Sequence, residues 1–126
     1  NLLLNVGPKA DGSIPEAQKV RLQGLGNWYQ KNREAINGTR AWKTPQAEGT
    51  GGERFRFTSK GDSVYLIALD PPVSGDGWTI PDFPMNTISS LELVGEETEI
   101  EFTLENGTLE LAKPQGASEA YAFRIK

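Results

Sequence analysis

The spacing of the apolar residues changes near residue 39 of this 126-residue chain. Between residues 13 and 38, apolar side chains recur every three or four positions, which is the period of one face of a helix. From residue 39 onward, many apolar side chains alternate with polar ones, which is the period of a half-buried strand. The pattern therefore predicts two parts of different character, residues 1–38 and residues 39–126.

The first part begins with an apolar run that does not alternate. Residues 1–6 read Asn-Leu-Leu-Leu-Asn-Val and are closed by Gly7-Pro8. Short runs of this kind are typical of strands buried on both faces, as in parallel sheets. One strand and one helix cannot form a parallel sheet, because parallel strands need crossover mates. Residues 1–38 therefore predict the remnant of a larger α/β domain.

A helix is predicted after a turn-rich loop that ends at Ser13. Ser13 fits the N-cap position, and Glu16, three residues later, completes a capping box. Asn37-Gly38 favours the end of the helix, because glycine accepts a left-handed conformation there. One face of this helix is apolar and comprises Leu22, Leu25, Tyr29 and Ile36, flanked by Val20 and Trp28.

The second part has the pattern of an antiparallel β-sandwich. Asn106-Gly107 is the strongest hairpin signal, and a two-residue turn there sets Leu104 opposite Leu109 and Phe102 opposite Leu111. Another strand follows this turn, and strands are also expected at residues 54–58, 63–69, 88–94, 98–104 and 121–125. Six strands at this spacing predict a mainly β fold, an antiparallel sandwich preceded by the βα remnant.

The composition removes several kinds of chemistry. The chain has no cysteine, which excludes disulfides and thiolate metal sites, and no histidine, which excludes Ser-His-Asp and Cys-His mechanisms within this chain. The net charge of −4 argues against nucleic acid as a partner, because phosphate binding needs a basic patch. No run of 18 apolar residues is present, so no membrane-spanning helix is expected.

Three stretches of the chain resemble α-L-fucosidases of glycoside hydrolase family 29. The first is Asn-Leu-Leu-Leu-Asn-Val-Gly-Pro-Lys-Ala-Asp-Gly-Ser-Ile-Pro at residues 1–15. The second comprises residues 26–29 and 32–39 with Trp42, and the third is residues 56–65, with a looser likeness at 88–95. The resemblance implies that residues 1–38 are the last strand, loop and helix of a (β/α)8-like barrel, and residues 39–126 the C-terminal β-sandwich domain.

The resemblance also implies retaining exo-hydrolysis of terminal α-L-fucose, with an aspartate nucleophile and a second carboxylate as acid/base. In the family, these two residues and the histidines that grip fucose lie on earlier barrel strands. None is carried over to a position in this chain, so we expect the chain alone to be inactive. The implied partner is a fucosylated glycan bound by the parent enzyme. No cofactor, nucleic acid or membrane is implied, and an extracellular or periplasmic location is favoured for a bacterial enzyme.

The loop after the first strand carries the candidate substrate-binding residues. Barrel sites lie at the C-terminal ends of strands, and the one such end in this chain runs from Asn5 to Asp11. We predict that Asn5, Lys9 and Asp11 line the rim of a sugar site in the full barrel. The alternative is that Asn5 and Asp11 hydrogen-bond the backbone of the turn.

Trp78 is a further candidate for substrate binding. It lies in a long connection, residues 70–86, which contains four prolines, and connections of this length are often functional. An exposed Trp78 would stack on a sugar ring. The alternative, which the pattern favours, is a proline-stiffened flap whose Trp78 and Phe83 cover the core of the sandwich.

Six glutamates lie between residues 96 and 110. The glutamates at 96, 97, 99, 101, 105 and 110 mostly form a solvated face at period 2, and no metal site is predicted from them. Self-association is predicted through Leu2–Val6 and the apolar helix face, because bare strand edges and large apolar patches are rarely left exposed. Two other functions stay open: a free-standing carbohydrate-binding or structural sandwich, and a small glycosidase that uses its own carboxylates or is completed by partner chains.

Overall fold

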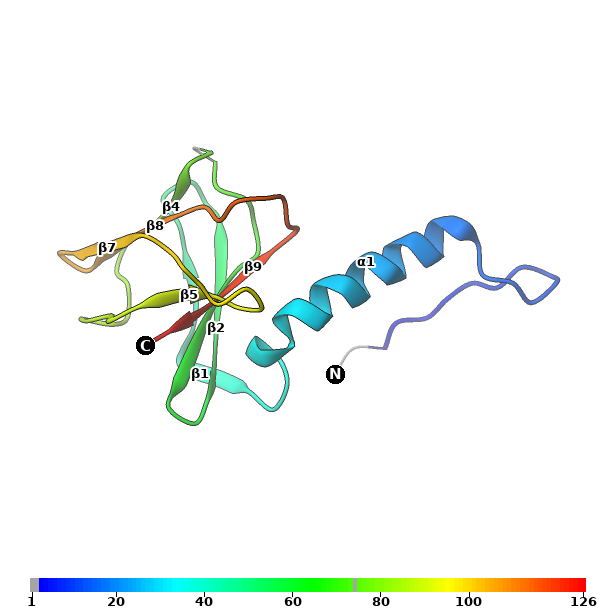
Figure 1. Ribbon diagram of the computed structural model, residues 1–126, viewed down its shortest axis with the longest axis horizontal. Helices are drawn as coiled ribbons and strands as arrows, with labels where there is room; N and C mark the ends of the chain where they lie inside the picture. Colours follow the sequence, from blue (N-terminus) through cyan, green and yellow to red (C-terminus); the bar gives the residue numbers. More distant parts are fainter. Residues whose placement is uncertain (1–2, 74) are drawn as a thin grey trace. The chain divides into compact units, whose positions relative to one another are not determined.

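A computed structural model describes residues 3–73 and 75–126 of the chain. It divides into two compact units, residues 1–30 and residues 31–126 (Figure 1). This division lies inside helix α1 (Glu16–Asn32) instead of between residues 38 and 39, where the sequence placed it. The difference arises because the residues after Gln30 pack on the strands of the second unit.

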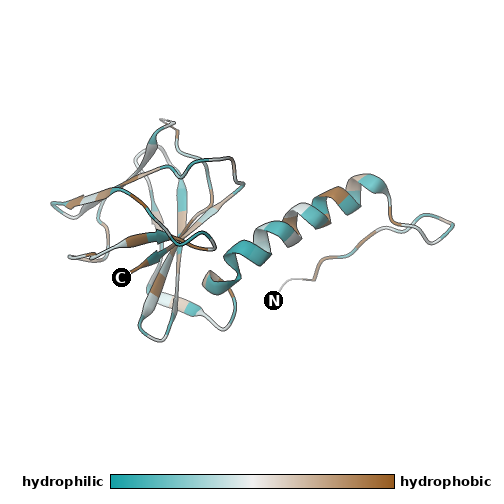
Figure 2. Cartoon of the chain, in the orientation of Figure 1, coloured by the Kyte–Doolittle hydropathy of each residue, from teal (hydrophilic) through white to brown (hydrophobic). Residues whose placement is uncertain are grey.

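The first unit holds the loop and most of helix α1. Residues 3–8 form no strand, and the first two residues of the predicted strand lie outside the described part of the chain. A strand needs a neighbour for its backbone hydrogen bonds, and the described residues of this unit contain no second strand. Figure 2 colours most of helix α1 as hydrophilic, with only a few apolar positions along it.

The predicted helix is present, and specific backbone features define where it begins and ends. The helix begins at Glu16, and the carbonyl of Pro15 accepts the N–H groups of Gln18 and Lys19. The prediction that Ser13 caps the helix was therefore wrong. At the other end α1 continues into a single 3₁₀ turn, η1 (Arg33–Ala35), and the chain turns away at Gly38 with φ of +69°, as the Asn-Gly pair predicted.

Two antiparallel sheets form the second unit (Figure 1). The larger sheet has six strands in the spatial order β1 (Arg40–Glu48), β2 (Arg54–Lys60), β3 (Ser63–Ala68), β9 (Tyr121–Ile125), β5 (Leu91–Leu93) and β6 (Thr98–Glu99). The smaller sheet has three, in the order β4 (Gly77–Ile80), β8 (Thr108–Ala112) and β7 (Phe102–Glu105). One apolar core joins the two sheets, so the β-sandwich predicted from the sequence is confirmed.

The hairpin at Asn106-Gly107 has the predicted register. Leu104 pairs with Leu109 and Phe102 with Leu111. The two turn residues have φ of +50° and +76°, so both are left-handed. Asn-Gly adopts this kind of turn at low energetic cost. The predicted strand at 98–104 is instead divided between the two sheets: the N–H of Ile100 bonds to Leu91 of the larger sheet, and the carbonyl of Glu101 accepts from Ala112 of the smaller one.

The core of the sandwich is rich in aromatic side chains. Trp78, Phe55 and Phe123 are each at most 1% exposed. The Trp78 ring lies edge-on to Tyr121 at 5.6 Å, to Phe123 at 6.0 Å and to Phe55 at 6.5 Å between centroids. Edge-to-face packing of this kind adds to the stabilisation from apolar burial. The long connection at 70–86 therefore contains β4 and contributes its largest side chain to the core.

A second, smaller apolar cluster lies on the other face of the six-stranded sheet, where alternate residues of its strands point away from the core. It comprises Ala35, Tyr65, Ile67, Val94 and Ala122, with Leu69 packed against it. Ala35 belongs to η1 and is fully buried. The end of the helical segment therefore covers this face of the sheet.

Candidate functional site

The loop between Gly7 and Ser13 is held by its own hydrogen bonds. The N–H of Lys9 bonds to the carbonyl of Ser13 at 2.8 Å, and the N–H of Gly12 bonds to the carbonyl of Lys9 at 2.9 Å. Gly12 has φ of +80°, which closes the turn. The loop is therefore an ordered turn, and both Lys9 and Asp11 belong to it.

Asp11 shapes this turn with its carboxylate. Its Oδ1 accepts the N–H of Ser13 at 2.9 Å and the hydroxyl of Ser13 at 2.7 Å. These hydrogen bonds, the hydroxyl's first, hold the pKa of Asp11 below its usual value. Asp11 therefore has the turn-stabilising role that the sequence offered as an alternative. The side chain stays exposed, so its rim role remains a prediction.

Asn5 lies apart from this turn, in a groove of the first unit. The groove has a volume of about 350 Å³, and Asn5 shares it with Leu4, Val6, Gly7, Gln18, Arg21, Leu22 and Leu25. The N–H of Gly7 bonds to Oε1 of Gln18 at 3.0 Å and fastens the loop to helix α1. Lys9 and Asp11 do not line this groove. The three predicted rim residues are therefore divided between a groove and a turn.

Trp78 is a core residue and not an exposed platform. Its side chain is 1% exposed, and its Nε1–H donates to the carbonyl of Asp70 at 3.0 Å. A buried ring has no free face on which a sugar can stack, so the exposed Trp78 considered from the sequence is corrected by the structure. The alternative reading, in which the aromatics of residues 70–86 cover the core, agrees with Phe83, which is 5% exposed.

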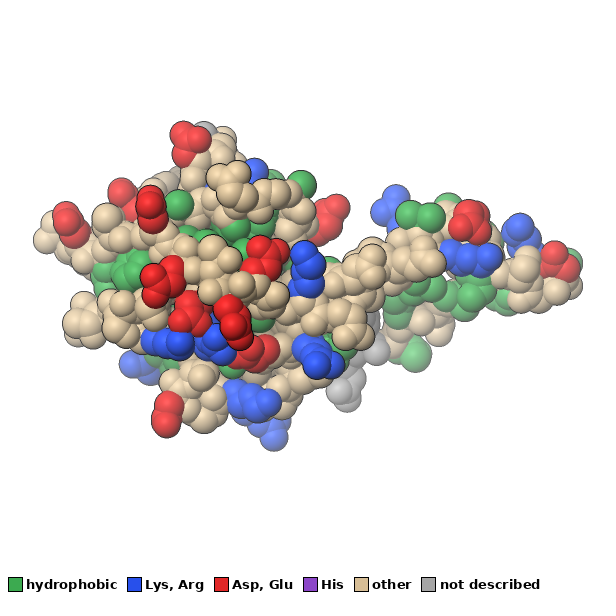
Figure 3. Space-filling view, in the orientation of Figure 1, with side chains coloured by type: hydrophobic (Ala, Val, Ile, Leu, Met, Phe, Trp, Pro, Cys, Tyr) green, Lys and Arg blue, Asp and Glu red, His purple; other side chains and the backbone are tan. Residues whose placement is uncertain are grey.

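The exposed glutamates lie where the alternation predicted them. Glu101, Thr103 and Glu110 share the outer face of the three-stranded sheet, and Figure 3 shows acidic side chains around β7 and β8. A shallow groove of about 540 Å³ crosses this face between Asp76, Glu101 and Glu110. Within residues 3–73 and 75–126, no three acidic, histidine or cysteine side chains gather in a way that would hold a metal ion.

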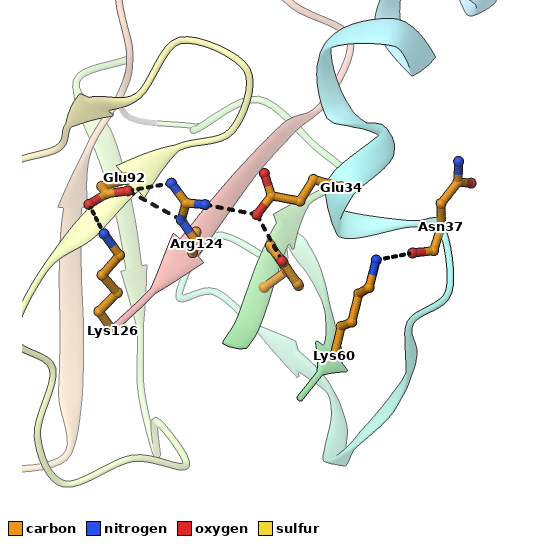
Figure 4. A network of polar contacts seen from close by, with 7 residues as sticks. Glu34, Asn37, Lys60, Glu92, Arg124 and Lys126 are labelled. Carbon is orange, nitrogen blue, oxygen red and sulfur yellow. Dashed lines mark hydrogen bonds and ion pairs between the residues drawn. The ribbon is translucent and has the colours of Figure 1, made fainter. Parts of the chain in front are cut away.

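An ion-pair network on the outer face of the six-stranded sheet was not predicted (Figure 4). Arg124 of β9 donates to Glu92 of β5 at 2.7 and 3.2 Å and to Glu34 of η1 at 2.9 Å. Glu34 also accepts the hydroxyl of Tyr65 at 2.8 Å, and Lys126 pairs with Glu92. Glu92 and Arg124 are register partners, so the signal was present as opposite charges at outward positions, but it required the strand order.

A buried carboxylate was also missed. Glu53 is 6% exposed and accepts the N–H of Val73 at 3.0 Å and that of Gly51 at 3.0 Å. The hydrogen bond from Val73 is the main reason why its pKa lies below the usual value, against the opposing effect of burial. Nothing in the sequence marks Glu53, because it stands just before a strand and bonds to a loop 20 residues later.

The comparisons with known proteins agree on one family. A family model described as alpha-L-fucosidase matches residues 1–34. An α-L-fucosidase of Branchiostoma floridae is 44% identical over 75 residues, which are 60% of this chain and 16% of that protein. Human tissue α-L-fucosidase is 39% identical over 75 residues, with the same shares. The chain thus spans about a sixth of the curated relatives that it matches.

Solved structures extend this likeness to the whole chain. The structure of an α-fucosidase of Thermotoga maritima matches with a TM-score of 0.83 and 34% identity, over 100% of this chain and 30% of that one. An α-L-fucosidase of Paenibacillus thiaminolyticus matches with a TM-score of 0.74 at 23% identity and supports the fold. No helix among the described residues is both long and apolar enough to cross a membrane. The chain is therefore similar in sequence and in fold to a portion of known α-L-fucosidases, as the resemblance indicated.

Proposed function

We propose that this chain is the C-terminal portion of a retaining exo-α-L-fucosidase that removes terminal fucose from glycans. The observation that carries the proposal is the continuous likeness to α-fucosidase structure over both units, at 34% identity over 100% of the chain. The nucleophile and the acid/base belong to earlier barrel strands in this family. The sugar ring of the substrate would therefore bind mainly to a part of the protein outside these 126 residues.

The chain alone is expected to have no fucosidase activity. Barrel active sites are built from the ends of several strands, and this chain contributes one such end. The carboxylate at that end, Asp11, is already engaged by the N–H and hydroxyl of Ser13. A histidine is also missing from the sequence, so the commonest general base is not supplied.

Within the parent enzyme, Asn5, Lys9 and Asp11 would form part of the rim of the sugar site. The Asp11 turn and the bond from Gly7 to Gln18 support this role, because both fix the loop that follows the predicted strand. An ordered loop holds polar side chains in place at little entropic cost on binding. Lys9 and Asp11 are exposed in this loop and offer hydrogen-bonding groups to a hydroxylated ligand.

The proposal is tested with an aryl α-L-fucoside. The complete gene product is expected to hydrolyse it with retention of configuration, and the 126-residue chain is expected to give no turnover. Failure of the complete product to release fucose would overturn the proposal. So would activity of the short chain that survives repurification and disappears when one of its own carboxylates is changed.

The rim role has its own test in the complete product. Asn5→Ala and Lys9→Ala should each lower kcat/KM by roughly tenfold, which corresponds to about 1.4 kcal/mol of lost interaction in the transition state. Lys19→Ala is the matched control, because Lys19 is exposed on helix α1 and pairs with Glu16 one helical turn before it. Unchanged kinetics in both rim variants would remove these residues from the sugar site and leave the fucosidase assignment standing.

We also propose that this chain, when expressed by itself, associates with further copies through its first unit. Exposed apolar side chains support this: Leu3 is 85% exposed, Leu4 53%, Val20 58% and Leu25 45%. Figure 3 shows hydrophobic side chains exposed along the helical unit. Hiding a few hundred Å² of such surface contributes several kcal/mol at about 25 cal/mol per Å².

Light scattering over a range of concentrations measures this association. Leu25→Glu places a charge in the groove of the first unit and should lower the average mass. Val73→Glu is the control, since Val73 is 75% exposed but belongs to the sandwich. A monomer at every concentration, or an equal effect of both substitutions, would contradict association through the first unit.

A further inference from the structure

The exit segment, defined here as residues 31–37, follows the body of helix α1 and belongs to the same compact unit as the sandwich. Its central residue for packing is Ala35, which is fully buried against the outer face of the six-stranded sheet. Tyr65, Ile67 and Ala122 form this part of the face. The cluster is separate from the core between the sheets, and Ala35 is the member of it that the exit segment supplies.

Polar contacts fix the same segment in one orientation. Glu34 Oε1 lies between the hydroxyl of Tyr65 at 2.8 Å and Nη1 of Arg124 at 2.9 Å (Figure 4). Arg124 is itself oriented by Glu92, which accepts from Nε and Nη2 of the same guanidinium. A guanidinium held in this planar way presents its remaining N–H to Glu34 in a fixed direction.

The backbone of the exit segment also lies in close contact with the sandwich at two places. Thr58 Oγ1 donates to the carbonyl of Ala35 at 2.7 Å. On the other side, a side chain at Gly95 would place its Cβ 2.5 Å from the carbonyl oxygen of Lys31, and Gly95 has φ of +83°. Only glycine lets the turn after β5 approach the helix end this closely.

We propose that Glu34 and Arg124 are positioning residues that lock the exit segment to the outer face of the six-stranded sheet, so that the sandwich holds the C-terminal end of the last helix of the catalytic barrel. The barrel in this statement rests on the proposed function. The lock itself rests on the contacts above. Neither side chain belongs to the core, since Glu34 is 41% and Arg124 25% exposed, and the two sheets pack without them. Their common effect is to hold the exit segment on the outer face of the six-stranded sheet.

Hydrogen exchange in the 126-residue chain tests the lock. Two amides report on it, because Ile36 and Asn37 both donate to the carbonyl of Arg33 within the segment. Arg124→Gln should speed exchange at these two amides by at least about tenfold while leaving β3 amides such as Leu66 unchanged. Glu34→Gln, which keeps an oxygen for Tyr65 but loses the charge, should give a smaller acceleration at the same amides.

The matched control is Arg54→Gln. Arg54 makes an equally close pair with Asp70, at 2.8 Å, on the same sheet but away from the exit segment. It should leave Ile36 and Asn37 unaffected. Gly95→Ala is the second route to the same effect, because it forces the turn away from Lys31 without touching any charge.

Three results would overturn the lock: unchanged exchange at Ile36 and Asn37 in Arg124→Gln, acceleration that is equal throughout the sandwich, or an effect of Arg54→Gln of the same size. These results are distinct from the fucoside assay. A complete gene product without activity would remove the barrel and leave the exchange pattern standing. Loss of the exchange pattern would leave the fucosidase proposal untouched.

Discussion

The two units of this chain differ in what their apolar residues do. In residues 31–126, the aromatic and aliphatic side chains of the strands are buried between two sheets, and several are fully buried. In residues 3–30, no side chain reaches full burial, although the helix and the run before it carry many leucines. The same kinds of residues thus form a core in one unit and an open surface in the other. An apolar pattern therefore specifies a face, and the fold around it decides whether that face is covered.

The largest effect expected from this comparison is on the sandwich core. Trp78→Ala removes a ring that is 1% exposed and packs against three other aromatics, and should lower the free energy of unfolding by about 3–5 kcal/mol. Leu25→Ala in the first unit, where the side chain is 45% exposed, should cost less than about 0.5 kcal/mol. Urea unfolding followed by circular dichroism measures both. Equal losses of unfolding free energy in the two variants would contradict the contrast between a unit with a buried core and a unit with an exposed apolar surface.

The next effect concerns the buried carboxylate of Glu53. Glu53→Ala leaves the N–H groups of Gly51 and Val73 without their acceptor and should cost about 1–3 kcal/mol. The wild-type contribution also depends on pH. Because hydrogen bonds hold the folded pKa below the usual 4.5, the contribution is complete above that value and is lost as the pH falls through the lower folded pKa.

Glu53→Gln separates the two effects. Its amide oxygen still accepts one N–H, so it should be less destabilising than Glu53→Ala, and it should remove the acid-dependent part of the stability. Chemical unfolding at neutral pH and near pH 3 provides the comparison. Stability that falls equally with acid in wild type and in Glu53→Gln would show that another group governs this pH range.

A smaller effect is expected at the hairpin turn. Gly107 has φ of +76°, so Gly107→Ala should destabilise the chain by about 1–2 kcal/mol. Gly24→Ala is the matched control in the first unit, because Gly24 lies inside helix α1 with nothing within 4 Å of an added Cβ. There the substitution should favour the helix by about 1 kcal/mol, seen as higher helicity. Opposite signs from one kind of change would sharpen the contrast between the two units.

The pKa of Asp70 tests the Arg54–Asp70 ion pair on the surface of the sandwich. Arg54 donates to both carboxylate oxygens of Asp70, and this hydrogen bonding is the main reason why its pKa falls to about 2 from the usual 3.8. The pair therefore contributes fully above about pH 4 and is lost as the pH falls towards 2. Titration of the carboxyl carbon by NMR should show the pKa moving back towards 3.8 in Arg54→Gln. An unchanged low pKa would exclude the Arg54 side chain as its main cause, because the variant keeps the backbone N–H that also bonds to Asp70.

The sequence predicted those features of the fold that depend on local pattern. The Asn106-Gly107 register and the strands around Phe55, Leu66 and Phe123 follow from alternation and turn residues alone. Strand β1 was missed because it is an edge strand whose alternation is broken by Pro45 and by a register shift between Ala41 and Gln46. Strand β4 was missed because it is short and lies among prolines.

The contacts of the polar and charged residues were harder to predict from the sequence, because most of them join distant parts of the chain. The turn at Asp11 is local, and its backbone role was among the alternatives considered. The contacts of Glu34, Arg124 and Glu53 span 90 and 20 residues of sequence, and they exist only once the strand order is known. The sequence therefore indicates which faces of this molecule are apolar or charged, whereas the partners of each face depend on the three-dimensional structure.

The smallest effect is predicted for removal of the first unit. A chain of residues 31–126 should unfold with a free energy within about 0.5 kcal/mol of the full chain, because no side chain of residues 3–30 is buried. A chain of residues 39–126 should lose more, about 1–3 kcal/mol, because it uncovers Tyr65, Ile67 and Ala122 and leaves Arg124 without Glu34. Urea unfolding of the three chains gives the comparison directly. If the two truncated chains are equally stable, the exit segment contributes nothing to the sandwich and the boundary belongs after residue 38. If residues 31–126 are much less stable than the full chain, the first unit supports the sandwich, and the contrast between the units fails.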